Sequence, residues 1–310
     1  MRALDEPFRE MGEFAQMQEI LQKDGGRISV SGCVDSQKMH MVYGLSKKLR
    51  NRVIVTFSDI RTKEIYEDYK LYDRNTVLYP AKDMIFYQAD VQGNRLTMER
   101  MRVLRRILEG VPVTMVTTFD ALMAYQAPID ALRRGMISLR KGQELPYQQI
   151  AEVLTATGYE KVYQVEEPGQ FAMRGGILDI FDLTEENPYR IELWGDEVDS
   201  IRSFDVQSQR SIEQLSSVSI YPATELVLFE EDIQKGAAKI EKEGKQMEKT
   251  LREAMNTEEA HRIKVQTAEL LEQLSESRSS VNLDSYIRYF YQNPVSFLDF
   301  FDRENTLFVM

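Results

Sequence analysis

The sequence has almost none of the residues that build disulfide frameworks or zinc sites. Its 310 residues include one cysteine, Cys33, and two histidines, His40 and His261. A single cysteine excludes an internal disulfide and indicates a reducing cytoplasm. With so little Cys and His, a zinc site built on these ligands is excluded as well, and we expect no metal centre.

The chain also lacks a long apolar run and an excess of positive charge. No apolar stretch approaches the length of a membrane span, and the first residues are too charged for a signal peptide, so no membrane association is expected. Asp and Glu number 50 against 39 Lys and Arg, a formal net charge of −11. Because phosphate neutralisation needs a basic face, this balance argues against a self-sufficient nucleic-acid binder and suits a partner with a basic surface.

What the sequence does contain is the composition of a soluble globular protein, with 43% hydrophobic and 29% charged residues. Its length exceeds that of one typical core, so two or three domains are expected. We place their boundaries at residues 1–135, 136–222 and 223–310.

The first third alternates apolar strands with amphipathic helices. We expect strands at 27–31, 52–57, 77–79 and 111–117, and helices at 8–23, 40–49, 62–71, 97–108 and 119–125. This βαβα order predicts an α/β domain with a parallel sheet covered by helices.

Part of a phosphate-binding loop stands between the first of these strands and the next helix. Gly32 opens the loop and Lys38 closes it, as in nucleotide-binding proteins. A working loop has Gly before the Lys and Ser or Thr after it, but this chain has Gln37 and Met39. Met cannot bind a hard cation such as Mg²⁺. We therefore predict a degenerate site without hydrolysis, no catalytic residue and no cofactor; the alternative is a simple strand-to-helix turn.

The middle third predicts an α+β domain with antiparallel strands. Within it, residues 189–194 alternate, so that Ile191 and Leu193 face the core while Arg190 and Trp194 face solvent. Arg174, on a preceding strand, could join them. Trp and Arg are the residue types that most often dominate protein–protein contacts. Two alternatives are that a loop covers Trp194 and that Arg190 merely pairs with Glu192.

The last third begins with a long helix whose apolar positions recur every three or four residues. These positions are Ile233, Ala237, Ile240, Gly244, Met247, Leu251 and Ala254. A coiled-coil dimer is conceivable, but Gly and Ala are weak coiled-coil knobs, which favours a helix lying along its own domain. A second helix is expected at 257–274. The chain ends inside a strand at 305–310, from which we expect a fragment of a longer protein.

Three segments identify a family. FAMRGGILDIF, PYRIELWGDEVDSIRSFDVQSQRS and GYEKVYQVEEPGQF resemble the N-terminal, UvrB-homologous region of the transcription-repair coupling factors (Mfd). The resemblance covers nearly the whole chain. It implies a degenerate RecA-like domain, split into N- and C-terminal parts, with an inserted α+β antiparallel domain like the UvrA-binding domain of UvrB.

The resemblance also implies a function and partners. The UvrA contact would be made by Arg174, Arg190 and Trp194, the last usually Phe in this family. The expected role is non-catalytic recruitment of UvrA to stalled transcription for nucleotide excision repair. Full-length members would add an ATP- and Mg-dependent DNA translocase, RNA polymerase binding, and a C-terminal domain that covers the UvrA-binding face.

Two alternatives stay open. One is an active UvrB-like ATPase or helicase, and the other is a DNA-binding scaffold. UvrB has a long aromatic hairpin for DNA, whereas residues 80–95 are here only a short loop with Phe86 and Tyr87. The short loop favours a scaffold over a motor.

Overall fold

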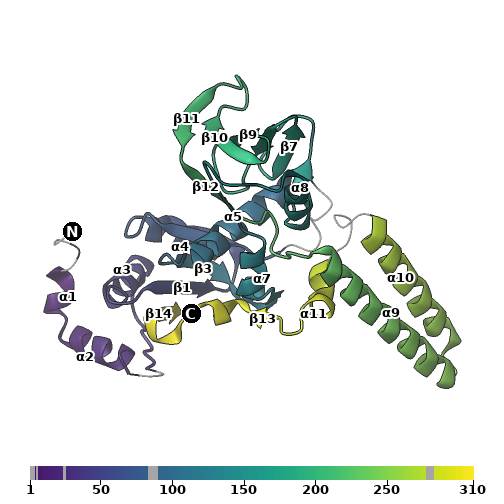
Figure 1. Cartoon of the computed structure of the whole chain (residues 1–310). Helices are drawn as coiled ribbons and strands as arrows, with labels where there is room; N and C mark the ends of the chain where they lie inside the picture. The colour runs from purple at the N-terminus through teal and green to yellow at the C-terminus, as the bar shows by residue number, and fades with distance from the viewer. Residues whose placement is uncertain (1–3, 5, 24–25, 83–89, 277–282) are drawn as a thin grey trace. The chain divides into compact units, whose positions relative to one another are not determined.

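The computed structural model describes residue 4 and residues 6–23, 26–82, 90–276 and 283–310 (Figure 1). The chain forms two compact units, Met1–Ala124 with Ser296–Met310, and Tyr125–Val295. The boundaries expected after residues 135 and 222 remain predictions. Residues 83–89, which include Phe86 and Tyr87, lie outside the described residues, so the expectation about this loop does too.

The first unit is built on a parallel sheet. Its strand order is β14 (Thr306–Val309), β1 (Asn51–Thr56), β3 (Thr114–Thr118), β2 (Thr76–Tyr79). β1 and β3 are buried almost throughout, as expected for strands covered on both faces. The predicted α/β architecture is confirmed. β14 pairs in parallel with β1, so residues 306–309 join a sheet that begins near residue 51.

Six helices accompany this sheet in the described residues of the first unit. They are α1 (Glu6–Glu10), α2 (Gly12–Leu21), α3 (Asp35–Leu45), α4 (Asp59–Lys70), α5 (Asp90–Glu109) and α6 (Phe119–Met123), with 3₁₀ turns η4 (Phe297–Phe300) and η5 (Arg303–Asn305). The single helix expected at 8–23 is divided, because Met11 has an extended backbone. Ser58 and Thr118 cap α4 and α6 by accepting backbone N–H bonds.

The strand expected at 27–31 is wrong: these residues are described and form no strand. Ile28 and Val30 alternate as in a strand, but a strand needs a neighbour to satisfy its backbone groups. Beside β1, the outer position of the sheet is taken by β14. The segment therefore runs as irregular chain into α3, which begins at Asp35, five residues before the expected start at 40.

The second unit holds an antiparallel sheet of six strands. Its order is β11 (Ser211–Leu215), β10 (Glu197–Phe204), β9 (Tyr189–Trp194), β8 (Ile177–Ile180), β7 (Gln170–Arg174), β6 (Glu160–Lys161), in which only β6 and β7 are parallel. Two further strand pairs are β5 (Ile137–Arg140) with β12 (Ser217–Ile220) and β4 (Tyr125–Gln126) with β13 (Val295–Ser296), and two shorter helices are α7 (Ile129–Arg134) and α8 (Tyr147–Ala156). The strand expected at 160–166 is limited to β6.

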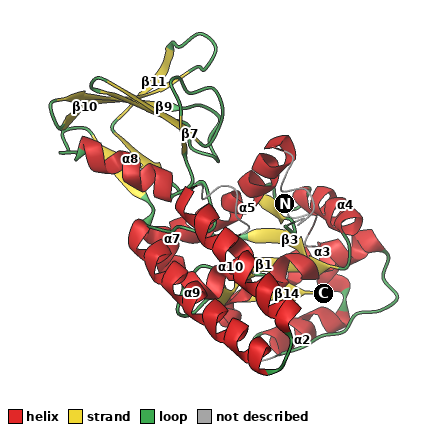
Figure 2. Ribbon diagram, turned by 90° about the vertical axis from the view of Figure 1, so that its right-hand side faces the viewer, coloured by secondary structure: helices red, strands yellow, loops and turns green. Residues whose placement is uncertain are grey.

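Two long helices lie side by side and antiparallel (Figures 1 and 2). They are α9 (Glu230–Glu253) and α10 (Thr257–Glu276), followed by η3 (Leu283–Tyr286) and α11 (Ile287–Phe290). Ile233 and Ile240 of α9 are buried in a core with Leu270 and Phe290. The first half of the apolar seam of α9 is thus covered by helices of its own unit, whereas Met247 is 52% exposed, and the choice between a helix along its own domain and a coiled-coil dimer stays a prediction. Across the described residues, none of the helices has the length and apolarity to cross a membrane.

Candidate protein-docking surface

A two-glycine turn places Arg174 at the end of β7. The register pairs Arg174 with Ile177, which leaves Gly175 and Gly176 as the turn between β7 and β8. Gly175 has φ +59°, a left-handed conformation that suits glycine. The Leu193 N–H of β9 bonds to the Gly176 carbonyl at 2.8 Å. The turn is therefore anchored to the strand that carries Trp194.

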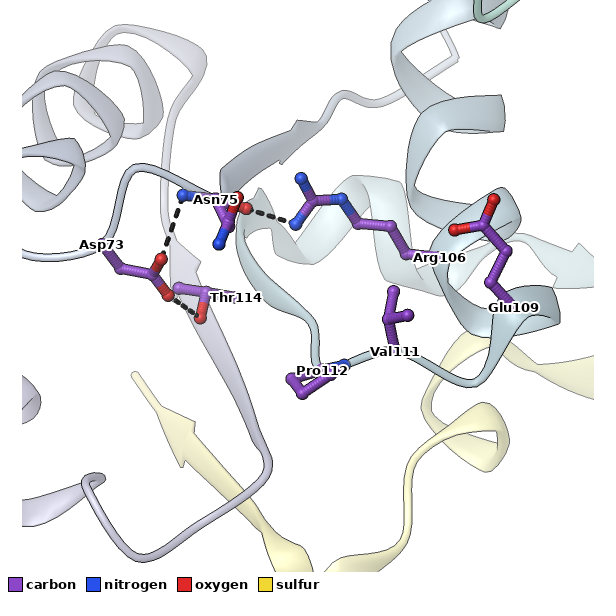
Figure 3. A pocket seen from close by; sticks show the side chains of 7 residues that line it. All are labelled: Asp73, Asn75, Arg106, Glu109, Val111, Pro112 and Thr114. Atoms are coloured by element: carbon purple, nitrogen blue, oxygen red, sulfur yellow. Dashed lines mark hydrogen bonds between the residues drawn. The ribbon is translucent and has the colours of Figure 1, made fainter.

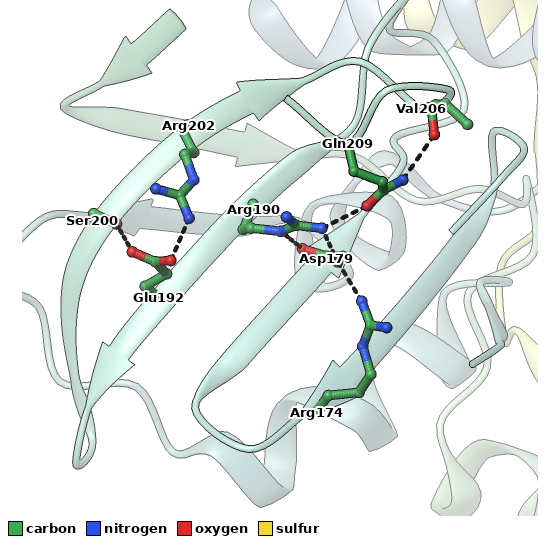
Figure 4. A network of polar contacts seen from close by, with 8 residues as sticks. All are labelled: Arg174, Asp179, Arg190, Glu192, Ser200, Arg202, Val206 and Gln209. Atoms are coloured by element: carbon green, nitrogen blue, oxygen red, sulfur yellow. Dashed lines mark hydrogen bonds and ion pairs between the residues drawn. The ribbon is translucent and has the colours of Figure 1, made fainter. Parts of the chain in front are cut away.

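Asp179 joins the two arginines that the sequence singles out (Figure 4). It lies on β8 opposite Arg190 of β9, and its side chain is only 2% exposed. Arg190 donates from Nε and Nη2 to the two carboxylate oxygens at 2.7 and 2.8 Å. Arg174 donates from Nη2 to Oδ2 at 3.2 Å. The structure thus brings Arg174 and Arg190 together on one carboxylate.

Arg190 is enclosed on its other sides as well. Its Nη2 also donates to Oε1 of Gln209 at 2.9 Å, and its guanidinium carbon lies 4.3 Å from the ring centroid of the buried Phe204. The hydrogen bonds to Asp179 raise the pKa of Arg190 above its ordinary value. The side chain is 15% exposed, whereas that of Arg174 is 37% exposed. The two arginines therefore differ in how firmly they are held.

Gln209 is positioned by an uncommon backbone conformation. Its φ is +57°, a left-handed value that non-glycine residues seldom adopt, and its N–H bonds to the Asp205 carbonyl at 2.8 Å. Its amide nitrogen donates to the Val206 carbonyl at 2.8 Å, which turns its oxygen toward Arg190. The loop between β10 and β11 thus provides a hydrogen-bond acceptor for Arg190, in addition to Asp179 of β8.

Trp194 points into solvent. It is 85% exposed, while Ile191 of the same strand is fully buried and Leu193 half-buried. Alternation along β9 puts Trp194 on the same face as Arg190. The alternative of an indole covered by a loop does not hold in the structure. Glu192 accepts hydrogen bonds from Ser200 and Arg202 of β10, so the alternative in which it serves as the partner of Arg190 does not hold either.

An exposed tyrosine that sequence reasoning missed lies next to Arg174. Tyr163, in the loop between β6 and β7, is 83% exposed. The guanidinium carbon of Arg174 lies 5.4 Å from its ring centroid, within cation–π range. Tyr163 stands in the segment expected to be a strand at 160–166, where it had no assigned role. We call Tyr163, Arg174, Arg190 and Trp194 the docking surface.

The two residues of the degenerate phosphate loop lie in different local structures, Gly32 in irregular chain and Lys38 in the helix α3. Gly32, with φ +78°, is exposed, and the strand expected before it is absent from the described residues 27–31. Lys38 lies in the first turns of α3 and pairs with Asp35 at 3.1 Å. Asp35 pairs also with Arg61 of α4 at 2.9 Å. The assignment of Gly32 and Lys38 to a nucleotide relic remains a prediction.

A polar cavity of about 320 Å³ lies where β2 and β3 begin (Figure 3). It is lined by Asp73, Asn75, Arg106, Glu109, Val111, Pro112 and Thr114. Hydrogen bonds within the wall join Arg106 to the Asn75 carbonyl and Thr114 to Asp73. Ligands of parallel sheets bind at the opposite, carboxyl end of the strands. The cavity therefore receives no functional assignment.

Comparisons with known proteins agree with the resemblance carried by the sequence. Residues 137–226 match the family model of the UvrB interaction domain. The chain is 32% identical over 306 residues to the transcription-repair-coupling factor of Bacillus subtilis (strain 168), a match covering 94% of this chain and 26% of that protein. It is 34% identical over 155 residues to the transcription-repair-coupling factor of Staphylococcus aureus (strain MRSA252), covering 50% of this chain and 13% of that protein. The predicted resemblance is confirmed, and the chain spans about a quarter or less of these relatives.

Proposed function

We propose that this chain, a relative of the transcription-repair coupling factors, is a non-catalytic UvrB-like module that recruits UvrA to stalled transcription for nucleotide excision repair. UvrA would bind the docking surface through Arg174, Arg190 and Trp194. The observation that carries the proposal is the exposure of Trp194, 85%, on the sheet face of both arginines and within the matched residues 137–226.

The chemistry of the surface supports a protein partner. Because the indole of Trp194 stays exposed to solvent in the folded chain, it does not stabilise the core. It can, however, bury a large apolar area against a partner protein. The two arginines share a single carboxylate, so the surface keeps a positive excess within a chain of net charge −11. Arg and Trp together are the composition of binding hot spots.

Two observations support a non-catalytic first unit. The amino group of Lys38 forms an ion pair with Asp35 of the same helix, which competes with any phosphate group for this lysine. Met39, which stands where a nucleotide-binding loop has its Mg²⁺ ligand, is 4% exposed and packs in the core with Val42 and Ile54. A buried thioether cannot offer an oxygen ligand to a hard cation.

The partners of a whole coupling factor are part of the same proposal. The relatives are about four times longer than this chain, since the match covers 26% of one of them. ATP- and Mg-dependent DNA translocation and RNA polymerase binding would belong to modules outside residues 1–310. A C-terminal domain of the same protein would cover the docking surface until activation.

Binding to purified UvrA tests the proposal. Trp194→Ala and Arg174→Ala are each expected to weaken the complex by about 2 kcal/mol, roughly 30-fold, as losses of hot-spot residues. Phe57→Ala is the matched control, because Phe57 is an aromatic residue of the first unit that is also 85% exposed. Isothermal titration calorimetry measures all three. Wild-type affinity in both surface variants contradicts the proposal.

A further inference from the structure

The two arginines of the docking surface are bound to Asp179 in unequal ways. Arg190 forms a two-bond fork, using both carboxylate oxygens, and has Gln209 and the ring of Phe204 as further neighbours. Arg174 adds one longer bond, 3.2 Å, to an oxygen that Arg190 already occupies. If Arg174 moves away, Asp179 keeps both bonds from Arg190. If Arg190 moves away, a buried carboxylate keeps only one.

The exposed neighbour of Arg174 is Tyr163. Its ring lies under the guanidinium and is otherwise in water, at 83% exposure. A planar guanidinium can stack on an aromatic ring and pair with a carboxylate at the same time, because the two contacts use its face and its edge. Tyr163 can therefore keep contact with Arg174 while the arginine changes its ionic partner.

Resting on the proposed function, we infer that docking exchanges the partner of Arg174. The guanidinium leaves Asp179 for a carboxylate of the partner protein and stays on the ring of Tyr163, which is itself a contact residue. Arg190 does not leave Asp179: of the three residues proposed for UvrA binding, it contributes as a positioning residue, because it keeps the carboxylate hydrogen-bonded when Arg174 turns to the partner. The partner surface that fits has an acidic side chain beside an apolar patch for Tyr163 and Trp194.

Substitution of Tyr163 tests the contact role. Tyr163→Ala is expected to weaken UvrA binding about tenfold, whereas Tyr163→Phe keeps the ring and stays within about twofold of the wild type. Ile212→Ala, at an apolar residue of β11 that is 56% exposed, is the matched control and is expected to have no effect. The thermal unfolding of Tyr163→Ala should equal that of the wild type, since the side chain lies in solvent. Wild-type affinity of Tyr163→Ala overturns the inference.

Salt dependence separates the roles of the two arginines. An ion pair that Arg174 forms across the interface makes the affinity fall as salt rises, because salt screens charges in contact with solvent. Arg174→Ala should flatten the dependence of log Kd on log salt concentration. Arg190→Gln, which removes the positive charge, should keep the wild-type slope, because Arg190 forms no ion pair with the partner. Equal flattening in both variants shows that Arg190 also contacts the partner and overturns its positioning role.

The outcomes also distinguish this inference from the function on which it rests. If wild-type chain does not bind UvrA, or if Trp194→Ala and Arg174→Ala bind like the wild type, the proposed function itself fails. If these two variants lose binding while Tyr163→Ala does not, the docking function stands and the role of Tyr163 is wrong.

Discussion

Asp179 and Arg190 face each other across the pairing of β8 with β9 and are joined by two hydrogen bonds of 2.7 and 2.8 Å. The carboxylate is almost fully buried, at 2% side-chain exposure. A forked pair of this kind fixes the orientation of both groups. The docking surface is thus built on a rigid ion pair within the sheet and not on loop residues alone.

Arg190→Ala is expected to lower the free energy of unfolding by about 3 kcal/mol, because it leaves the buried Asp179 with a single cation. Arg174→Ala is the matched control: it removes one bond to the same carboxylate from a side chain that is 37% exposed, and should cost about 1 kcal/mol or less. Urea unfolding measures both. Equal losses would show that Asp179 does not depend chiefly on Arg190.

ATP is not expected to bind the described part of this chain with micromolar affinity. Lys38 is paired with Asp35, and the segment before Gly32 lacks the strand that holds a phosphate loop in place. Calorimetry with ATP and Mg²⁺ measures this, with a working P-loop ATPase as positive control in the same buffer. A dissociation constant in the micromolar range would restore the ATPase alternative.

Gly236→Ala should destabilise the second unit although Ala is the better helix former. A Cβ on Gly236 would lie 2.5 Å from Cε1 of Phe290, closer than atoms can approach. Overpacking of about 2 kcal/mol is expected to outweigh a helix-propensity gain of about 1 kcal/mol. Gly12→Ala in α2 is the control, since no atom lies within 4 Å of its added Cβ. Thermal unfolding that is unchanged or higher for Gly236→Ala would refute this packing argument.

Alkaline pH should destabilise the second unit through Tyr291. Burial raises the pKa of its phenol, and the charge of Asp232 raises it further; the hydroxyl donates to the Val227 carbonyl at 2.8 Å. In the unfolded chain this proton is lost near pH 10, so the contribution is complete below about pH 10 and lost at higher pH. The free energy of unfolding should therefore fall as pH rises above about 10.

Tyr291→Phe should make that fall smaller, by up to about 1.4 kcal/mol per pH unit, while costing about 1 kcal/mol at neutral pH for the lost hydrogen bond. The measurement is urea unfolding at a series of alkaline pH values. Tyr163→Phe is the control, because Tyr163 stays in solvent on folding. The same fall in wild type and Tyr291→Phe would exclude Tyr291 as its source.

Alternation along β9 could be predicted from sequence because backbone geometry fixes it. Successive side chains of a strand point to opposite faces, so an apolar Ile191 in the core requires Trp194 on the other face. The structure has Ile191 fully buried and Trp194 85% exposed. The parallel sheet of the first unit was predictable for a similar reason, since near-continuous apolar runs such as 52–57 suit strands covered on both faces.

Cross-strand partners could not be predicted in the same way. Arg174 and Arg190 contact Asp179 only because the two-glycine turn and the β8–β9 register place the three residues side by side. The hydrophobic periodicity of a strand does not determine which residues of the next strand lie opposite it. A signal was present, however: Asp179 stands between Leu178 and Ile180, and a charged residue in an apolar strand needs a partner. The strand expected at 27–31 failed for a complementary reason, because local alternation does not provide a neighbouring strand.

The pairing of β14 with β1 has a consequence for the order of folding. Asn51 donates a side-chain hydrogen bond to Thr306, 255 residues later, so β1 gains this neighbour only after the intervening residues have left the ribosome. Tyr125–Val295 is continuous in sequence and can complete its core during that interval. We expect the docking surface to fold first on the nascent chain, before β14 has paired with the N-terminal segment that carries β1.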